Sequence, residues 1–372
     1  MITILDLISD TNIGGAGRVI LNYLHYTDLE HFRTLVAVPR GSALASPLKK
    51  AGAEVYEVDA MADRSYDKED VKVLTEFIRR VKPDLVHTHG CLSGRIAAKK
   101  CGLPVVYSRH SAFPVPAKLK YPPGRWVNRW LNRHYADKII AVSPATMDNL
   151  VESGVAPDQI TVVMNGVAPL TPTAPEEQAA LKKELGIGPD TVVFGILARI
   201  EEYKGHGLIA QAARQLKDRG MDFKVLVAGT GQWAGQLDEL VQELDVDDVM
   251  PRLGFRSDVA ALLSILDVQL NASFGTEATS IALLEGMSLC KPSIVSDYGG
   301  NPWLVKDGDN GLVFPSGDSG ALADAMERLM DHPEQRQAMG RRARQVFEQR
   351  FTGQVFARNT EQVYLDVLKG AH

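Results

Sequence analysis

The chain has 372 residues, of which 45% are hydrophobic, and a formal net charge of −5. The length exceeds what one hydrophobic core usually serves and the composition is that of a folded protein, so we expect two globular domains. The small net charge excludes bulk attraction to nucleic acid or to anionic membranes, and leaves room only for a local basic patch.

The N-terminal segment and the cysteines indicate a protein of the reducing cytoplasm. The first residues, MITILDLISD, carry Asp6 and Asp10 and no early basic residue, so they do not resemble a signal peptide. No apolar run reaches the roughly 18 residues that a bilayer span needs. Cys91, Cys101 and Cys290 form no C-x-x-C pair, which argues against a zinc site or a disulfide framework. We expect a cytoplasmic chain that at most rests on the inner face of the cell membrane.

The first half of the chain alternates short apolar runs with helical patterns. The runs are ITILDLI, RTLVAVP, EVYEV, DLVHTH, PVVYSR, KIIAVS and ITVVMN. Near-continuous apolar strands are typical of parallel sheets that are buried on both faces. Stretches such as DVKVLTEFIRRV have the helical pattern, so the alternation predicts a doubly wound α/β sheet.

A glycine-rich loop, SDTNIGGAGRV, follows the first predicted strand. Ligands of open parallel sheets bind beyond the carboxyl ends of the strands. Gly14, Gly15 and Gly17 would let the backbone approach a ligand and would present amides at a helix N-terminus to an anion. The loop is not G-x-G-x-x-G, and a tight turn without a ligand is the alternative.

The segment KLKYPPGRWVNRWLNRHYADK combines basic and aromatic residues. Its basic residues include Lys118, Lys120, Arg125, Arg129 and Arg133. The arginines recur at four-residue spacing, as do Trp126 and Trp130, so a helix would carry neighbouring basic and aromatic stripes. This pattern is typical of an interfacial helix that touches anionic lipid. The alternative is a packed helix with solvated arginines on its outer face.

A proline-rich stretch, NGVAPLTPTAPEE, interrupts the alternation and is the best linker candidate. Apolar runs then resume with TVVFGILAR, FKVLVAG, VMPRLGF, DVQLNAS, PSIVSD and GLVFP. We therefore predict an N-terminal domain over 1–168 and a C-terminal domain over 169–355. The segment 356–372 has the apolar spacing of one helix face and is expected to cross back to the first domain.

Loops after strands of the second half carry the candidate donor-binding residues. Arg199 and Lys204 follow TVVFGIL, where two cations would suit a pyrophosphate, although a solvated surface pair is the alternative. Gly229 and Gly231 follow FKVLVA and would shape the floor of the same site.

Two glutamates lie in the next such loop and the helix after it, SFGTEATSIALLEGM. That helix is expected to begin near Thr279 or Ser280, where its unpaired amides would suit phosphate. Glu277 and Glu285 would lie about 12 Å apart along a continuous helix, which is too far for a retaining carboxylate pair at about 5 Å. The spacing suits two parts of one extended ligand, such as a ribose and a sugar. A buried ion pair at Glu285 is the alternative.

These residues together resemble the retaining nucleotide-sugar glycosyltransferases of family 4, which have the GT-B fold. Glu277 to Glu285 is similar to the family's E-x7-E, ARIEEYKG to its G-R-L-x-x-x-K-G, and IGGAGRV to its N-terminal glycine loop. NGV, KPSIVSDYGGNPWLV and DGDNGLVF are similar to further family landmarks, and the likeness covers nearly the whole chain.

The resemblance implies two Rossmann-like domains that face a central cleft, with the acceptor on the first and the donor on the second. Arg199 and Lys204 would bind the donor diphosphate, Glu285 the ribose, and Glu277 the transferred hexose near its 3-hydroxyl. His110, in YSRHSAF, would be the active-site histidine beside the donor sugar. Without the resemblance, the sequence would leave His110 as a core histidine with satisfied hydrogen bonds. His87 and His89 are expected to line or support the cleft.

The implied reaction moves a hexose or N-acetylhexosamine from a UDP- or GDP-sugar to a glycan or lipid-linked acceptor. Retention would follow from front-face attack with the leaving phosphate as base. No D-x-D motif is apparent, so we expect no metal and no other cofactor. Arg199, Lys204 and a helix dipole would neutralise the leaving diphosphate.

The sequence departs from the family pattern at three positions and leaves rival functions open. Ala198 and Ala278 replace glycines, and Trp303 stands where the family usually has a glutamate. A nucleotide-sugar epimerase of the same fold and a non-catalytic sugar-nucleotide sensor would share the site. A dinucleotide oxidoreductase is disfavoured because the first loop lacks G-x-G-x-x-G.

Overall fold

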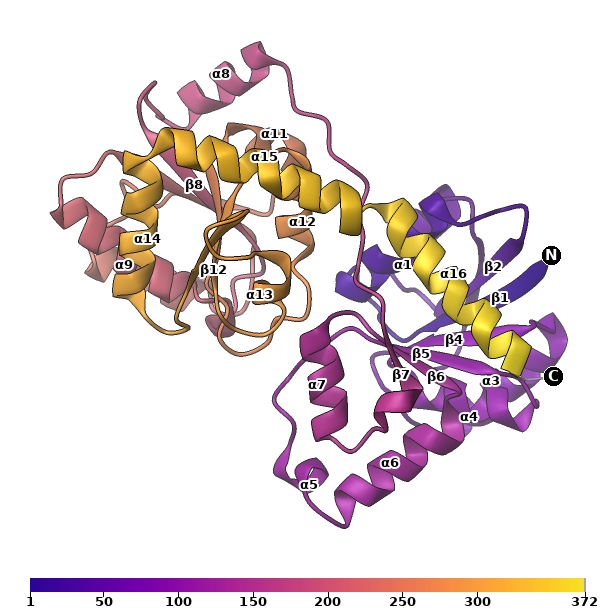
Figure 1. Cartoon of the computed structure of the whole chain (residues 1–372). Coiled ribbons are helices and arrows are strands. Elements are labelled where there is room, and N and C mark those ends of the chain that lie inside the picture. The colour runs from indigo at the N-terminus through magenta and orange to yellow at the C-terminus, as the bar shows by residue number, and fades with distance from the viewer. Residues whose placement is uncertain (371–372) are drawn as a thin grey trace. The chain divides into compact units, whose positions relative to one another are not determined.

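The computed structural model describes residues 1–370 and divides into two compact units (Figure 1). Unit 1 comprises Met1–Val167 and Phe351–His372, and unit 2 comprises Ala168–Arg350. The expected divisions, after 168 and after 355, therefore lie at 167 and 350 in the structure. The chain rejoins unit 1 just after Arg350 because Val167 and Thr352 form a parallel β-bridge there. Residues 371–372 of the predicted returning segment lie outside the described residues.

Unit 1 is built on a seven-stranded sheet in which every strand pairs in parallel, in the order β3-β2-β1-β4-β5-β6-β7. Its strands are β1 (Ile2–Ile8), β2 (Phe32–Pro39), β3 (Glu54–Val58), β4 (Leu85–His89), β5 (Val105–Arg109), β6 (Lys138–Ala141) and β7 (Ile160–Val162). Its helices are α1 (Gly15–Tyr26), α2 (Ala45–Lys50), α3 (Lys68–Val81), α4 (Leu92–Lys100), α5 (Ala117–Lys120), α6 (Gly124–Tyr135), α7 (Pro144–Glu152), the 3-10 turn η1 (Pro157–Gln159) and α16 (Gly353–Gly370).

Unit 2 repeats this design with six parallel strands in the order β10-β9-β8-β11-β12-β13. Its strands are β8 (Val192–Leu197), β9 (Phe223–Ala228), β10 (Arg252–Gly254), β11 (Val268–Asn271), β12 (Ser293–Ser296) and β13 (Gly311–Phe314). Its helices are α8 (Pro175–Glu184), the 3-10 turn η2 (Glu202–Lys204), α9 (His206–Asp218), α10 (Ala234–Glu243), α11 (Val259–Ile265), α12 (Ile281–Ser288), α13 (Asn301–Leu304), α14 (Ser319–Asp331) and α15 (Pro333–Arg350).

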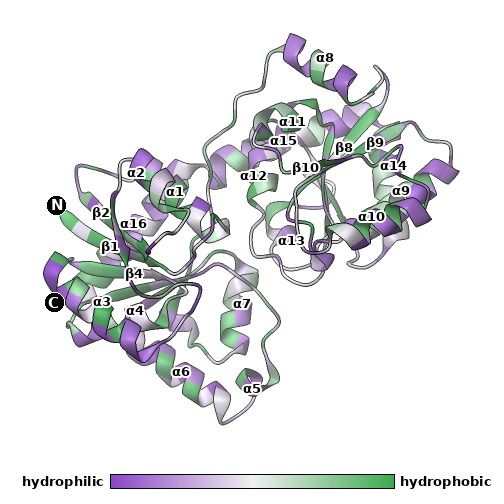
Figure 2. Cartoon of the chain, turned by 180° about the vertical axis from the view of Figure 1, so that it is seen from behind, coloured by the Kyte–Doolittle hydropathy of each residue, from purple (hydrophilic) through white to green (hydrophobic). Residues whose placement is uncertain are grey.

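Both sheets bury apolar side chains on both faces, as the near-continuous apolar strands predict. In β8, Val193 packs into one core cluster and the adjacent Phe194 into another on the opposite face. Figure 2 shows the consequence, with mostly green strands inside helices striped in green and purple. The predicted fold class, two α/β domains with doubly wound parallel sheets, is confirmed.

Helix α16 completes the core of unit 1. Its Phe356, Val363 and Tyr364 are buried, and the Tyr364 ring meets that of Tyr23 edge-on at 6.1 Å. Glu361 accepts hydrogen bonds at 2.9 Å from the Thr27 hydroxyl and from the backbone N–H of residue 28. The apolar face expected for this segment therefore packs on unit 1.

Strand order creates one switch point in each sheet. β1 lies between β2 and β4, and β8 lies between β9 and β11, so the connections wind outward in opposite directions from these strands. At such a point the loops after the two central strands diverge and leave a crevice at the carboxyl ends. The candidate residues Lys204 and Glu277 follow β8 and β11, and the histidines of VHTH belong to β4.

The tight packing of the second sheet makes a prediction about two glycines of unit 2. A Cβ on Gly195, in β8, would lie 2.6 Å from Cδ1 of the buried Leu266, whereas a Cβ on Gly235, in α10, meets nothing within 4 Å. We expect Gly195→Ala to lower the free energy of unfolding by about 1–3 kcal/mol through overpacking. Gly235→Ala should raise it by about 0.5 kcal/mol, because alanine restricts the unfolded chain. Urea denaturation of the two variants measures both effects, and equal stabilities would contradict the packing argument.

Candidate functional site

The switch point of unit 2 brings Lys204 and Glu277 together. Lys204 ends the turn η2 after β8, and Glu277 lies between β11 and α12. The Lys204 ammonium donates to Glu277 Oε2 at 2.8 Å, and the glutamate side chain is only 5% exposed. Both residues line a small cavity of about 20 Å³ at the ends of β8 and β11. Two loops predicted to act on one ligand therefore do meet in the fold.

The hydrogen-bond donors to Glu277 converge on one carboxylate oxygen, Oε2. Besides Lys204, the Asn271 amide donates to Oε2 at 3.1 Å, and the Ser273 hydroxyl lies at the same distance. Asn271 is the last residue of β11, and its own Oδ1 accepts the backbone N–H of Ser273 at 3.1 Å. The described residues supply no hydrogen bond to Oε1. The carboxylate is thus fixed through one oxygen, and the other can accept a hydroxyl of a ligand.

Gly229 and Gly231 allow the loop after β9 to pack against the loop that carries Arg199. A Cβ on Gly229 would lie 1.9 Å from the carbonyl oxygen of Ala198, and one on Gly231 would lie 2.0 Å from that of Ile200. Only glycine permits this contact between the loops after β8 and β9. Arg199 itself is exposed, and its Nη2 donates to the Tyr203 hydroxyl at 3.3 Å. Its guanidinium is available to an anion on this edge of unit 2.

Helix α12 begins where the sequence predicts. Ser280 is its N-cap, and the serine hydroxyl accepts the backbone N–H of Leu283 at 3.4 Å. Thr279 directly precedes the cap, and Glu285 lies half-buried one turn into the helix. The interval from Glu277 to Glu285 is helical only from Ile281, so the separation of a continuous helix does not apply to it.

The backbone of the Glu277 loop rests against a pair of glycines. The Gly300 N–H donates to the carbonyl of Glu277 at 2.8 Å, and Gly299 has a φ of 61°. A Cβ on Gly300 would lie 1.9 Å from the carbonyl oxygen of Ala278, so this position has no room for a side chain. Trp303, the departure from the family pattern, lies on the short helix α13 and is half exposed.

The three glycines of the first loop have different surroundings. Gly14 and Gly15 are exposed at the start of α1, and a Cβ on Gly15 would meet nothing within 4 Å. A Cβ on Gly17, by contrast, would lie 2.4 Å from Cδ2 of the buried Leu44. Gly17 therefore serves helix packing, whereas Gly14 and Gly15 leave backbone accessible at the N-terminus of α1.

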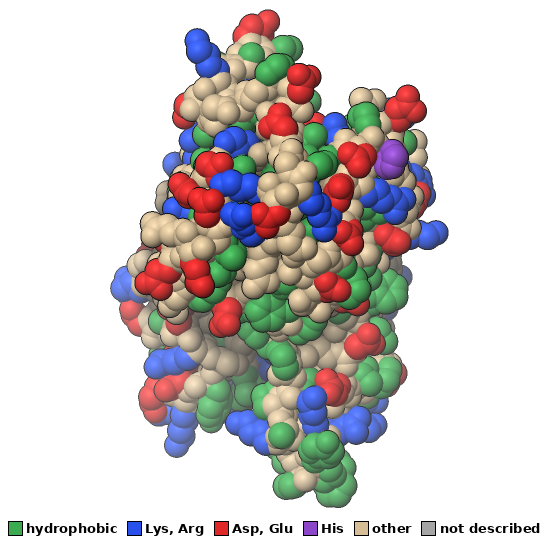
Figure 3. Space-filling model, turned by 90° about the vertical axis from the view of Figure 1, so that its left-hand side faces the viewer, with side chains coloured by type: hydrophobic (Ala, Val, Ile, Leu, Met, Phe, Trp, Pro, Cys, Tyr) green, Lys and Arg blue, Asp and Glu red, His purple; other side chains and the backbone are tan. Residues whose placement is uncertain are grey.

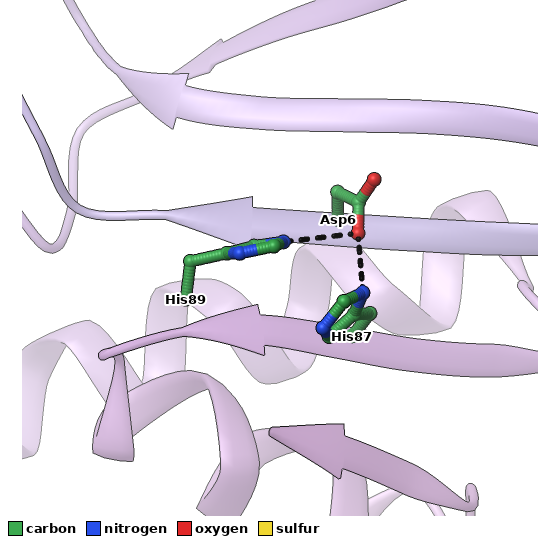
Figure 4. Close-up of side chains that lie close together, drawn as sticks. All are labelled: Asp6, His87 and His89. Carbon is green, nitrogen blue, oxygen red and sulfur yellow. Dashed lines mark hydrogen bonds and ion pairs between the residues drawn. The ribbon is translucent and has the colours of Figure 1, made fainter. Parts of the chain in front are cut away.

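A buried polar cluster occupies the switch point of unit 1 (Figure 4). Asp6 pairs with His87 across β1 and β4, and His87 and His89 lie on the same face of β4 because side chains alternate along a strand. Oδ1 of Asp6 faces Nδ1 of His87 at 3.2 Å and Nε2 of His89 at 3.3 Å. The cluster ends at His110, whose Nε2 lies 2.8 Å from Nδ1 of His89. His110 thus joins a hydrogen-bonded line rather than an apolar core.

Burial and hydrogen bonding shift the pKa values of this cluster. Burial alone would raise the pKa of Asp6, but the hydrogen bonds from His87 and His89 lower it to about 2. Burial, followed by the proximity of His89, lowers the pKa of His87 to about 4 and holds that of His110 well below 6.5. At neutral pH the structure therefore contains an ionised Asp6 beside neutral His87 and His110.

Two groups of described residues have the residue types and spacing of metal ligands. Ligand atoms of Asp6, His87 and His89 lie within 4.8 Å of one another, as do those of the exposed Asp28, Glu30 and His31. In the buried group these atoms already form hydrogen bonds with each other. Exposed acidic groups of this kind are common without an ion. Neither group therefore changes the sequence-based expectation about metals, which stays a prediction.

The basic–aromatic segment forms α5 and α6 with its apolar side chains outward. Trp126 is 67% exposed and Trp130 57%, and Asn132 is the one buried residue of α6. The arginines are exposed as the alternative of a packed helix expects, but the two tryptophans are exposed beside them. Hydrophobic and basic side chains adjoin at the lower end of Figure 3, where α5 and α6 lie.

Some basic residues of this segment form ion pairs and others do not. Lys120 pairs with Glu152 at 2.7 Å and Arg133 with Asp158 at 2.8 Å, and Arg125 donates to the Val151 carbonyl at 3.4 Å. Lys118 and Arg129 form no ion pair with any residue in the range 1–370. We call the exposed side chains of Lys118, Tyr121, Trp126, Arg129 and Trp130 the α5–α6 surface. Within residues 1–370, no helix combines the length and apolarity that crossing a membrane requires.

Three residues of these sites were not predicted as functional. In the sequence, Asp6 argues only against a signal peptide, and Asn271 and Ser273 belong to the apolar run DVQLNAS and the loop after it. A signal for Asp6 was present, because a carboxylate inside a buried strand has to find donors there. Asn271 and Ser273 carry no comparable signal.

Comparison with known families and proteins gives consistent matches along the chain. The family described as glycosyltransferase family 4 matches residues 13–169, and glycosyl transferases group 1 matches residues 177–346. A D-inositol 3-phosphate glycosyltransferase of Saccharomonospora viridis is 30% identical over 77% of this chain and 70% of that protein. An Escherichia coli enzyme named UDP-Gal:alpha-D-GlcNAc-diphosphoundecaprenol alpha-1,3-galactosyltransferase is 28% identical over 71% of each chain.

A solved structure shares the fold of the whole chain. Anabaena HepE, crystallised with UDP-glucose, superposes with a TM-score of 0.83 over 98% of this chain and all of that one, at 20% identity. This likeness concerns the fold, since the sequence identity is low.

The buried histidines of unit 1 predict a pH-dependent stability. The pKa of His87 is about 4 in the folded chain and about 6.5 when unfolded, so the unfolded state binds more protons between these values. Stability is therefore retained above pH 6.5 and lost as the pH falls toward 4. His87 alone should contribute a loss of about 2 kcal/mol between pH 7 and pH 5.

Urea denaturation at pH 7 and pH 5 measures this loss. His87→Gln should be less stable than wild type at pH 7 but should lose about 2 kcal/mol less on acidification. His332→Gln, at an exposed position, is the matched control and should retain the wild-type pH dependence. Identical pH dependence in all three proteins would contradict the assignment of a neutral, buried His87.

Proposed function

Because this chain belongs to the family 4 glycosyltransferases, which have the GT-B fold, we propose that it transfers a sugar from a nucleoside-diphosphate sugar. The observation that carries the proposal is the Lys204–Glu277 pair at the switch point of unit 2. A cation for a phosphate and a carboxylate for sugar hydroxyls lie side by side there. The glycosyltransferase activity follows from the family, and the donor, the acceptor and the stereochemistry are proposals.

The donor would lie along the carboxyl ends of the unit 2 strands. Arg199 and Lys204 bind the diphosphate, assisted by the amides that precede α12. Glu285 binds the ribose and Glu277 the hexose, with Gly229 and Gly231 holding the Arg199 loop in place. The crystallisation of Anabaena HepE with UDP-glucose supports a sugar nucleotide as the ligand of this fold. UDP- and GDP-sugars both fit this description.

The reaction would retain the configuration at the anomeric carbon. The bond from that carbon to the diphosphate oxygen breaks, and the acceptor oxygen bonds to the same face. The acceptor proton passes to the leaving diphosphate. Lys204 and Arg199 stabilise the charge that develops on this group, so the reaction should proceed without an added metal ion. If the Lys204 ammonium left Glu277, its side chain could turn toward the diphosphate.

The acceptor would be a glycan or lipid-linked saccharide that reaches unit 1 at a membrane surface. The E. coli relative is named for a diphosphoundecaprenol-linked acceptor, which supports a lipid-linked substrate. The α5–α6 surface supplies exposed tryptophans for the interface and unpaired Lys118 and Arg129 for anionic headgroups. An epimerase or a sugar-nucleotide sensor would have the same donor site, and product analysis separates them from a transferase.

Calorimetric titration tests the donor site. We expect one of UDP, GDP and ADP to bind without metal and NAD not to bind. Glu285→Ala should weaken nucleotide affinity about tenfold or more through loss of charge-assisted hydrogen bonds, whereas Glu277→Ala should retain affinity and lose turnover. Glu239→Ala, an exposed change on α10, is the control for removing one carboxylate. Affinity for NAD alone, or for no nucleotide, would refute the assignment of Arg199, Lys204 and Glu285.

Vesicle flotation tests the membrane contact. The protein should float with vesicles that contain anionic lipid at low salt and remain unbound with neutral ones. Lys118→Ser combined with Arg129→Ser should remove most of the binding, as should Trp126→Ser combined with Trp130→Ser. Lys68→Ser with Lys72→Ser, on exposed positions of α3, removes the same charge elsewhere and should bind like wild type. Equal flotation of all variants would refute the proposed surface.

A further inference from the structure

The turn η2 is fixed against the loop that follows β11. The backbone N–H of Phe274 donates to the carbonyl of Tyr203 at 2.9 Å. A Cβ on Gly275 would lie 2.5 Å from Cβ of Tyr203, so only glycine fits beside this residue. A Cβ on Gly205 would lie 2.1 Å from the carbonyl oxygen of Ala272. Because the two segments approach so closely, the backbone of Tyr203 has little freedom to move.

The Tyr203 hydroxyl is the hydrogen-bond partner of the Arg199 side chain. Nη2 of Arg199 donates to it at 3.3 Å, and this is the one hydrogen bond of that side chain within residues 1–370. No carboxylate in this range forms an ion pair with Arg199. Arginine is among the side chains that lose most rotamer entropy on ordering. The contact with a tyrosine on a fixed turn therefore restricts the exposed guanidinium before any ligand binds.

The ring of Tyr203 also lies beside the Lys204 ammonium. The ammonium is 5.9 Å from the ring centroid, near the outer limit of a cation–π contact, and 2.8 Å from Oε2 of Glu277. Tyr203 is thus a side chain that contacts both of the cations on this loop. Two like charges on one loop repel each other, and a bound anion removes that repulsion. An anion with two phosphate groups offers oxygens to both cations.

We propose that Tyr203 is a positioning residue for the donor diphosphate: its hydroxyl orients the Arg199 guanidinium and its ring the Lys204 ammonium, so that both cations reach one diphosphate. This inference rests on the proposed function, which assigns the two cations to that group. In the family pattern G-R-L-x-x-x-K-G, Tyr203 occupies the unspecified position directly before the lysine. Its contacts in the structure, rather than the motif, therefore assign its role.

Tyr203→Phe separates the hydroxyl from the rest of the side chain. Phenylalanine keeps the ring beside Lys204 and the Cβ that packs on Gly275. It also keeps the backbone carbonyl that accepts the N–H of Phe274. Tyr298→Phe is the matched control, because the Tyr298 hydroxyl donates to the Gly275 carbonyl at 2.8 Å. That hydroxyl supports the same loop and forms no hydrogen bond to either cation.

Calorimetric titration of the full chain with a nucleoside diphosphate and its monophosphate tests the proposal. The pair is UDP and UMP, GDP and GMP, or ADP and AMP, according to which diphosphate the wild type binds. Tyr203→Phe should weaken diphosphate affinity about fivefold, the effect of one hydrogen bond to a charged group. Monophosphate affinity should fall less than about twofold, because one phosphate does not need both cations.

The control separates a positioning role from a general disturbance of the loop. Tyr298→Phe should change the affinities for diphosphate and monophosphate by the same factor, and so keep the wild-type preference between them. If Tyr203→Phe also keeps that preference, the proposal is overturned.

A double-mutant cycle asks whether the hydroxyl acts through Arg199. Arg199→Ala should lower diphosphate affinity about tenfold, and adding Tyr203→Phe should lower it no further. If the two losses add, the hydroxyl acts without Arg199 and its positioning role is refuted. Tyr203→Leu removes the ring as well and should bind about threefold more weakly than Tyr203→Phe. Equal affinities of these two variants would refute the role of the ring at Lys204.

The failure of this inference and that of the proposed function give different results. If the wild type binds none of the three nucleoside diphosphates, the donor site and the inference fail together. If the wild type binds one of them and Tyr203→Phe keeps the wild-type preference for diphosphate, the donor site stands and the role of Tyr203 is refuted.

Discussion

Both units have to satisfy one buried carboxylate at the place where a parallel sheet changes winding direction. Asp6 in unit 1 and Glu277 in unit 2 are 1% and 4% exposed, and an unpaired charge at such depth would cost several kcal/mol. Each is supplied with donors by neighbouring strand ends: two imidazoles for Asp6, and an ammonium, an amide and a hydroxyl for Glu277. The crevice that the topology opens is therefore lined with oriented polar groups before any ligand arrives.

The two carboxylates differ in the oxygen that they leave available. In unit 1 a single oxygen of Asp6 accepts from both histidines, so its influence is passed along the imidazoles to His110. In unit 2 the donors converge on one oxygen of Glu277 and the carboxylate itself lines the cavity. One group therefore contacts a line of imidazole rings, whereas the other lines a cavity directly. Preorganisation of this kind reduces the reorganisation that a reaction would otherwise require.

The sequence was sufficient for the sheets and insufficient for the side-chain networks. Buried parallel strands can be recognised in the sequence because both of their faces are apolar. The start of α12 can be recognised from its serine N-cap, Ser280. The orientation of α6 could not be predicted, since an amphipathic pattern is the same whether its apolar stripe faces the core or the solvent. Asn271 donates to Glu277 within the loop after β11, whereas the register of β11 beside β8 brings this loop to Lys204, which is far away in the chain. Networks that cross strands depend on such registers, and composition does not encode them.

Because the chain returns to unit 1 at Phe351, the two units are completed at different points of synthesis. Unit 2 is continuous from Ala168 to Arg350, so all of its core is present once that segment has left the ribosome. Unit 1 is discontinuous, and Tyr364, which packs on Tyr23 and hydrogen-bonds His87, is made after all of unit 2. N-terminal domains usually fold first during synthesis. In this chain, α1 lacks its packing partner α16 until the segment after unit 2 has been made. Vectorial synthesis therefore completes the histidine cluster only after the whole of unit 2 has been made.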